Sequence, residues 1–282
     1  MHFGRRLGWD DSTIPRENKY RWTYASGVHM KIGIVGKGGV GKTTTSSLLA
    51  RVLVGRGRRV LAVDTDSNPN LGLSLGLSPE ATETLAPIPR SMVVGQRGDM
   101  TVAELMDDFS VLTPEGVALM SALRVNEAGA GCTCGGHASV KSLLGQALED
   151  ETDDTIIDME AGIEHLSRAG GTLANADVLI LLMEPSRKAV ITAQRTIGLA
   201  KELGIARWVG VGNKVDTDEA RQAIEELCAE HDVPLDVIIP STSDILAADR
   251  RGEPLDRDVA PEVWDAVESL VDSLELDVVP VG

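Results

Sequence analysis

The sequence predicts an α/β fold with a mostly parallel, doubly wound sheet flanked by helices. A glycine-rich loop at residues 36–43 lies between an apolar strand pattern at Lys31–Val35 and a helical pattern that includes Leu48, Leu49 and Val52. Short apolar segments then alternate with helical patterns, and each such α/β step adds a parallel strand. The further expected strands are Arg59–Asp64, Thr155–Asp158, Val178–Met183, Trp208–Gly212 and Asp236–Ile239.

The glycine-rich loop follows the pattern G-x-x-x-x-G-K-[ST], which predicts a site for nucleotide phosphates. Its glycines let backbone N–H groups surround phosphate oxygens, the Lys42 ammonium neutralises their charge, and the Thr43 hydroxyl is placed to bind Mg²⁺. A helix that begins after the loop adds the positive end of its dipole to the site. The predicted nucleotide-binding residues of the loop are Gly36, Lys37, Gly38, Gly39, Val40, Gly41, Lys42, Thr43 and Thr44.

A second lysine in this loop, Lys37, indicates which class of phosphate-loop protein the sequence resembles. The run Gly-Lys-Gly-Gly-Val-Gly-Lys-Thr-Thr resembles the loop of the deviant P-loop ATPases, a group that includes MinD, ParA, the nitrogenase iron protein and metal-insertion ATPases. This resemblance implies ATP as the nucleotide and a homodimer in which Lys37 reaches the partner's nucleotide. Lys37 and Lys42 are then both catalytic, because a cation supplied in trans to a phosphoryl transition state ties hydrolysis to dimerisation.

Carboxylates follow two of the predicted strands. Asp64 and Asp66 come at the end of the strand Arg59–Asp64, and Asp158 ends the strand Thr155–Asp158. Mg²⁺ and the attacking water are held at the carboxyl ends of strands beside a phosphate loop. We therefore expect Asp66 to orient water as a catalytic residue, and Asp64 and Asp158 to belong to the magnesium site. The roles of Asp64 and Asp66 are interchangeable on this reasoning.

Two cysteines form a candidate metal site. Thiolates two residues apart on an extended segment point to the same side, so Cys132 and Cys134 offer two soft ligands to one metal. A tetrahedral site needs more, either four thiolates from two chains about a twofold axis or a third ligand from His137. The other possibilities are a reduced, unliganded pair and a disulfide, which a reducing cytosol disfavours. Cys228 differs because it lies on an apolar helical stripe, where we expect a core residue.

A longer pattern identifies a subfamily. Residues 158–165, Asp-Met-Glu-Ala-Gly-Ile-Glu-His, carry Glu160 where partitioning ATPases have a proline, and Gly131-Cys132-Thr133-Cys134 precedes them. This combination resembles the CooC-type ATPases, which help to insert nickel into carbon monoxide dehydrogenase. The resemblance implies that Cys132 and Cys134 of both subunits hold Ni²⁺ or Zn²⁺, that nucleotide state controls metal transfer, and that a nickel-dependent carbon monoxide dehydrogenase is the client. No role follows for Glu164 or His165.

One motif leaves the choice between ATP and GTP open, namely Asn213-Lys214-Val215-Asp216. N-K-x-D is the guanine-reading motif of GTPases, but the deviant ATPases carry at this place an asparagine that touches adenine. Because the loop has the deviant lysine, we prefer ATP and assign Asn213 to nucleotide binding.

Charge and hydropathy exclude several functions. The chain has a net charge of −16, and residues 1–29 are basic at +2, so residues 30–282 carry −18. We expect no nucleic-acid partner, because phosphate backbones require a basic surface. The longest apolar run, Val178–Met183, is too short to span a bilayer, and the acidic stripe of the expected C-terminal helix does not suit a membrane tail. We expect a cytoplasmic protein with no membrane partner, with residues 30–282 as one domain and residues 1–29 as a disordered extension or a mis-assigned start.

Two other classes compete with the metal-insertion ATPase. A positioning or partitioning ATPase of the MinD or ParA kind would act on membrane or DNA without metal. An electron-donating iron protein would hold an iron–sulfur cluster between subunits. That family places its two cluster cysteines far apart in sequence, and this chain has no cysteines so placed.

Overall fold

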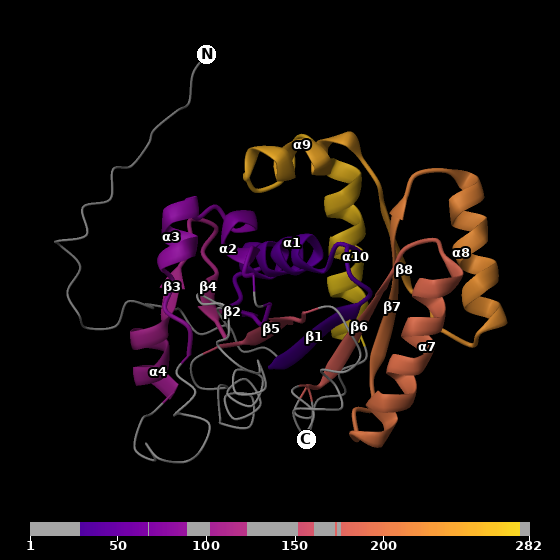
Figure 1. Ribbon diagram of the computed structural model, residues 1–282, viewed down its shortest axis with the longest axis horizontal. Helices are drawn as coiled ribbons and strands as arrows, with labels where there is room; N and C mark the ends of the chain where they lie inside the picture. Colours follow the sequence, from indigo (N-terminus) through magenta and orange to yellow (C-terminus); the bar gives the residue numbers. More distant parts are fainter. Residues whose placement is uncertain are drawn as a thin grey trace, which may run out of the picture.

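The computed structural model describes residues 29–66, 68–88, 102–122, 152–160, 173 and 176–276. Its centre is an eight-stranded sheet in the order β3-β4-β2-β5-β1-β6-β7-β8 (Figure 1). All neighbouring strands are parallel except β3 and β4, so the predicted α/β class is confirmed. The strands are β1 Met30–Gly36, β2 Val60–Asp64, β3 Ser110–Leu112, β4 Ala118–Ser121, β5 Asp154–Asp158, β6 Val178–Met183, β7 Trp208–Val215 and β8 Val237–Pro240.

The strand order places a topological switch point at the end of β1. From β1 the chain crosses to β2 on one side, while β6, β7 and β8 extend the sheet on the other. In an open parallel sheet, ligands bind outside the carboxyl ends of the strands at the point where the winding direction changes. The glycine-rich loop leaves β1 at this point.

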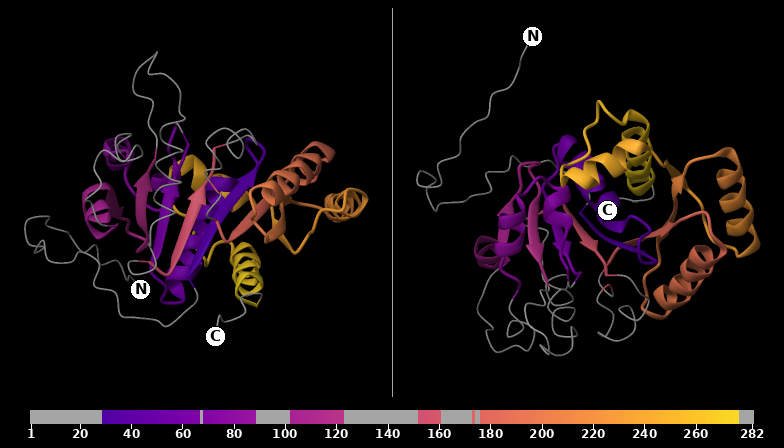
Figure 2. Two further views of the ribbon diagram at one scale, coloured as in Figure 1. Left: turned by 90° about the horizontal axis from the view of Figure 1, so that it is seen from below. Right: turned by 45° about the horizontal axis from the view of Figure 1, so that its top comes forward.

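Helices cover both faces of the sheet (Figures 1 and 2). On one face α1 and α10 pack against alternate residues of the strands, such as Ile180 of β6. On the other face α4, α7 and α8 pack against the intervening residues, such as Leu179 and Leu181. Because both faces are covered, β6 is apolar throughout and β2 is apolar up to Asp64. The helices are α1 Lys42–Gly55, α2 Leu71–Ser74, α3 Pro79–Thr84, α4 Val102–Phe109, α7 Arg187–Glu202, α8 Asp218–Glu230, α9 Ser243–Arg251 and α10 Pro261–Leu276.

Side-chain caps fix where four of these helices begin. The first turns of α3, α7, α8 and α9 donate backbone N–H hydrogen bonds to the hydroxyls of Ser78, Ser186, Thr217 and Thr242. Such caps satisfy donors that the helix itself leaves without partners. Cys228 lies on the inner side of α8 and is buried, which confirms the prediction that it is a core residue, and burial raises the pKa of its thiol to about 11.

The structure corrects the sequence prediction in the region between β2 and β5. Four prolines, Pro79, Pro87, Pro89 and Pro114, predict loops over residues 78–128 apart from a short helix at 101–109, which is α4. The chain also forms α3 and the hairpin of β3 and β4 in this stretch, and α2 just before it. The hairpin makes one pair of the sheet antiparallel, and its turn uses Gly116 with φ at 78°. Strands of three and four residues are too short to show a period of two. Apolar residues at helical spacing over 140–148 predict a further helix, and this prediction and the extension at 1–28 fall outside the described residues. No helix of the described part is long and apolar enough to cross a membrane.

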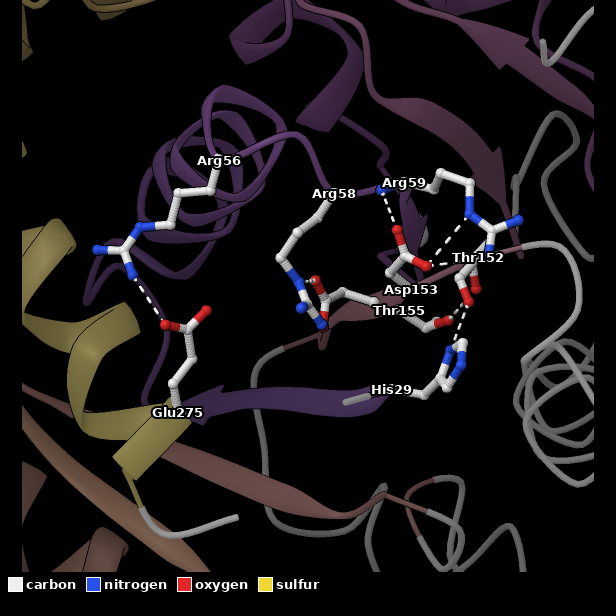
Figure 3. Close-up of polar contacts among 9 residues, drawn as sticks. His29, Arg56, Arg58, Arg59, Thr152, Asp153, Thr155 and Glu275 are labelled. Atoms are coloured by element: carbon white, nitrogen blue, oxygen red, sulfur yellow. Dashed lines mark hydrogen bonds and ion pairs between the residues drawn. The ribbon is translucent and has the colours of Figure 1, made fainter. Parts of the chain in front are cut away.

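Two arginine–aspartate pairs join β2 to β5 at the amino ends of these strands (Figure 3). The Arg59 guanidinium donates to Asp153 at 2.9 Å, and its backbone N–H donates to the same carboxylate at 2.8 Å. Arg58 binds Asp154 with both oxygens engaged. Arg59 and Asp153 are both buried, so each charge depends on the other for its solvation.

We predict that Arg59→Met destabilises the protein by about 3 kcal/mol, because it leaves the buried Asp153 carboxylate without its counter-ion. The midpoint of urea unfolding at pH 7.5 measures this loss. Arg187→Met is the matched control, since Arg187 forms the same kind of pair with Glu230 on the exposed surface. Its midpoint should stay close to that of the wild type, and equal midpoints for the two variants would contradict the proposed role of burial.

Candidate nucleotide site

The glycine-rich loop connects the end of β1 to the start of α1. Residues 37–40 form a turn in which the Val40 N–H donates to the Lys37 carbonyl at 3.3 Å, with φ of Gly39 at 77°. Gly41 precedes α1 with φ at 98°, and a Cβ atom there would lie 2.5 Å from Nδ2 of Asn213. Only glycine fits this conformation and space. The N-terminus of α1, with its first backbone N–H groups, therefore lies directly at the loop, as phosphate binding requires.

Lys42 is the buried cation of the site. Its side chain is folded back onto the loop, where Nζ donates to the carbonyls of Gly36 at 3.3 Å and Lys37 at 3.4 Å. Burial lowers the pKa of Lys42, and the negative charges of Asp158, Asp66 and Glu160 offset part of this effect. An anion on the loop would favour the charged form further.

Asp64 and Asp158 lie side by side at the carboxyl ends of β2 and β5, where they are paired in register. Both are buried, each with 2% of its surface exposed. Burial raises the pKa of Asp64 to about 7, and the neighbouring Asp158 charge adds to the effect. Burial also raises the pKa of Asp158 to about 6, while the nearby Thr43 and Ser46 hydroxyls and the Lys42 charge oppose the shift. Two buried like charges need a cation.

The carboxylates suit Mg²⁺ in part. Within the described residues, Asp158 Oδ1 and Ser46 Oγ are buried polar atoms without a hydrogen-bond partner. The carboxylate oxygen of Asp158 is therefore available to a water or a cation. Both oxygens of Asp64 already accept backbone hydrogen bonds of 3.0 Å, from Asp66 and Leu71. Mg²⁺ takes one or two carboxylates together with phosphates and waters, and Asp158 offers an oxygen to such a site.

Thr65 fixes the geometry of these acids. Its buried hydroxyl donates to the Asp158 carbonyl at 2.8 Å and accepts from the Glu160 N–H at 3.3 Å. The next residue, Asp66, is partly exposed and accepts the Asn68 N–H at 2.9 Å. It acts on Lys42 electrostatically, so Asp66 and Asp158 both lie near this lysine.

Three contacts at the loop were not predicted. The Asn213 amide, expected at the nucleotide, donates to the carbonyl of Val40 at 2.8 Å. Lys214 donates to the carbonyl of Gly39 at 2.6 Å, and the exposed Lys37 lies 3.5 Å from Glu184 after β6. The only sequence signals for them were the N-K-x-D motif and an acid directly after a strand.

Comparisons with known proteins decide the family. The family model described as the CobQ/CobB/MinD/ParA nucleotide binding domain matches residues 33–255. The chain belongs to this family. It is 36% identical to the carbon monoxide dehydrogenase accessory protein CooC of Rhodospirillum rubrum over 87% of this chain and 96% of that protein. It is also 31% identical to an uncharacterised ATP-binding protein of Methanocaldococcus jannaschii, over 81% of this chain and 92% of that protein.

A solved structure supports the same fold. The septum site-determining protein MinD of Pyrococcus horikoshii, complexed with Mg-ADP, superposes with a TM-score of 0.67 at 23% identity, covering 88% of this chain and 96% of that chain. As a member of the CobQ/CobB/MinD/ParA family, the chain is a P-loop ATPase, and its resemblance to the CooC-type proteins is confirmed.

The candidate metal ligands of this family member lie elsewhere in the chain. Cys132, Cys134 and His137 fall outside the described residues, as do Glu164 and His165. The cysteine site therefore stays a prediction from sequence.

We predict that Asp158→Asn stabilises the nucleotide-free protein at pH 7.5 while it removes the stabilisation by Mg²⁺ and nucleotide. The folded-state pKa of Asp158 is raised, so the ionised carboxylate costs stability above its unfolded pKa. The gain of the variant, about 3 kcal/mol, should grow from about pH 4 to about pH 6 and then level off. Unfolding midpoints across this range, with and without Mg-ADP, measure both effects. A variant that Mg-ADP stabilises as strongly as the wild type would contradict a magnesium role.

Proposed function

We propose that this ATPase is a dimeric metallochaperone that assists nickel insertion into a nickel-dependent carbon monoxide dehydrogenase. The observation that supports this most is the 36% identity to CooC over nearly the whole length of that protein, combined with Cys132-x-Cys134 in this chain. Ni²⁺ is then the cargo, with Zn²⁺ accepted by the same thiolates. A pair of cysteines from each subunit would complete a tetrahedral site.

The nucleotide site supports control by ATP. In this proposal Thr43 and Asp158 would hold Mg²⁺, with Asp64 beside them in the magnesium site; the ion would neutralise phosphate charge, and Asp66 orients the attacking water. Asp66 suits this role better than Asp64, because Asp64 uses both oxygens to hold the chain from Asp66 to Leu71. Asp158 also begins the stretch 158–165 that resembles the CooC-type proteins.

In this proposal Lys37 acts between subunits, and its surroundings are compatible with that role. Its side chain is exposed, and its contact with Glu184 at 3.5 Å is long for an ion pair between partly exposed groups. Such a pair contributes little stability. The ammonium is therefore free to leave Glu184 and to reach a nucleotide on a partner subunit.

The structure gives no support to membrane positioning through α10. Its apolar residues Val263, Val267, Leu270 and Leu274 are fully buried against the sheet, as the sequence predicted. Arg56 and Arg257 pair with acids of its polar face. The apolar stripe of α10 is thus used in the core.

We predict about one nickel or zinc ion per two chains in a dimer, and loss of this metal in Cys132→Ser/Cys134→Ser. Elemental analysis of a peak whose mass is measured by light scattering, with and without ATP, tests this. Cys228→Ala is the matched control and should keep the metal, because this buried thiol resists ionisation. A metal-free wild type that still dimerises with ATP would refute the metal role and leave a nucleotide switch.

We also predict that Lys37→Ala and Lys42→Ala differ. Lys37→Ala should bind Mg-ADP nearly as tightly as the wild type but lose hydrolysis and ATP-dependent dimers by at least about tenfold, because its cation acts in trans. Lys42→Ala should lose nucleotide binding itself, because this lysine lies at the loop. Calorimetry with Mg-ADP and phosphate release with ATP separate the two. Full hydrolysis by Lys37→Ala would contradict the proposal.

A further inference from the structure

A lysine from outside the glycine-rich loop is held against it. Lys214 lies near the end of β7, and its Nζ donates a hydrogen bond of 2.6 Å to the carbonyl of Gly39. The preceding residue, Asn213, donates to the carbonyl of Val40 at 2.8 Å. Two adjacent side chains of one strand thus bind two successive carbonyls of the loop.

The backbone of Lys214 has the marks of a functional position. Its φ is 60°, and Lys214 and Asp232 are the two residues of the described part, glycines aside, with positive φ. The pairing of β7 with β8 is also irregular between Gly212 and Val215. A bulge of this kind redirects side chains, and a left-handed lysine persists where its surroundings impose it.

These contacts complete the support of the loop. A peptide unit is planar and trans, so a donor that fixes its C=O also fixes the direction of its N–H. Lys42 binds the carbonyls of Gly36 and Lys37, and Lys214 binds that of Gly39. The peptide held by Lys214 is the one whose N–H, from Val40, closes the turn onto the Lys37 carbonyl.

We propose that Lys214 is a positioning residue that holds the phosphate loop in its binding shape before nucleotide arrives. Lys214 contacts the loop and acts on phosphate binding through it, although it belongs to the N-K-x-D motif, which binds the guanine base in GTPases. The inference depends on phosphate binding by the loop of this family and not on the proposed metal delivery.

The test compares two probes, Mg-ADP and Mg-tripolyphosphate, which carries phosphates without a base. Lys214→Met should weaken the binding of both by roughly tenfold, as expected for one charged hydrogen bond that shapes the site. Lys214→Gly should do the same without lowering the thermal unfolding midpoint, because glycine adopts φ of 60° without strain. Lys214→Arg should restore most of the affinity. Displacement of a fluorescent ADP analogue gives each Kd.

Two controls separate position from charge and strain. Asp232→Gly relaxes the other left-handed residue, and Lys201→Met removes a lysine beside Trp208 at the far end of β7. Neither should change either Kd. The losses at Lys214 should also persist in 0.5 M salt, where the attraction of an exposed charge is screened.

Three results would overturn the inference. Weaker Mg-ADP binding with unchanged tripolyphosphate binding would mean that Lys214 contacts the base. Wild-type affinity for both probes in Lys214→Met would mean that the contact has no role, and a loss that disappears in high salt would mean a surface charge only. Cys132→Ser/Cys134→Ser should bind tripolyphosphate as the wild type does, so a failure of the metal proposal is seen separately.

Discussion

The site depends on the charge imbalance around Asp64 and Asp158. Two carboxylates are buried side by side at the ends of β2 and β5, and the nearest buried cation, Lys42, is itself poorly solvated. Without a ligand, burial disfavours the charged forms of both aspartates and of the lysine. Mg²⁺ relieves the aspartates and phosphate relieves the lysine, so the binding of each should favour the binding of the other. The fold keeps this imbalance because its hydrophobic core covers both faces of the sheet.

At the amino ends of β2 and β5, in contrast, each buried carboxylate has a counter-ion. There Arg58 and Arg59 neutralise Asp154 and Asp153 at the start of the same two strands. β2 and β5 are therefore fixed at one end by complete ion pairs and at the other by the Thr65 hydroxyl. Asp64 and Asp158, at the predicted nucleotide site, therefore lie on a rigid support, as a precisely arranged binding site requires.

The sequence predicted most of what is local. The glycine-rich loop, the central strands and the aspartates at their ends follow from short patterns with a clear physical meaning. The β3–β4 hairpin was missed because its strands are too short to show a pattern. Contacts between distant segments, such as Lys214 with Gly39 or Arg59 with Asp153, have no local signature at all. Asn213 contacts the glycine-rich loop through a hydrogen bond to the Val40 carbonyl that was not predictable, and its contact with nucleotide stays a prediction.

The strand order also has a consequence for synthesis on the ribosome. β1 emerges first, yet its two neighbours in the sheet are β5 and β6, which begin at Asp154 and Val178. Until those strands appear, the glycine-rich loop has no sheet behind it and the apolar side of α1 has little to cover it. A nascent or truncated chain that stops before β7 also lacks Asn213 and Lys214. Such a fragment exposes apolar surface that chaperones and proteases recognise, and it cannot bind nucleotide in the manner of the finished protein.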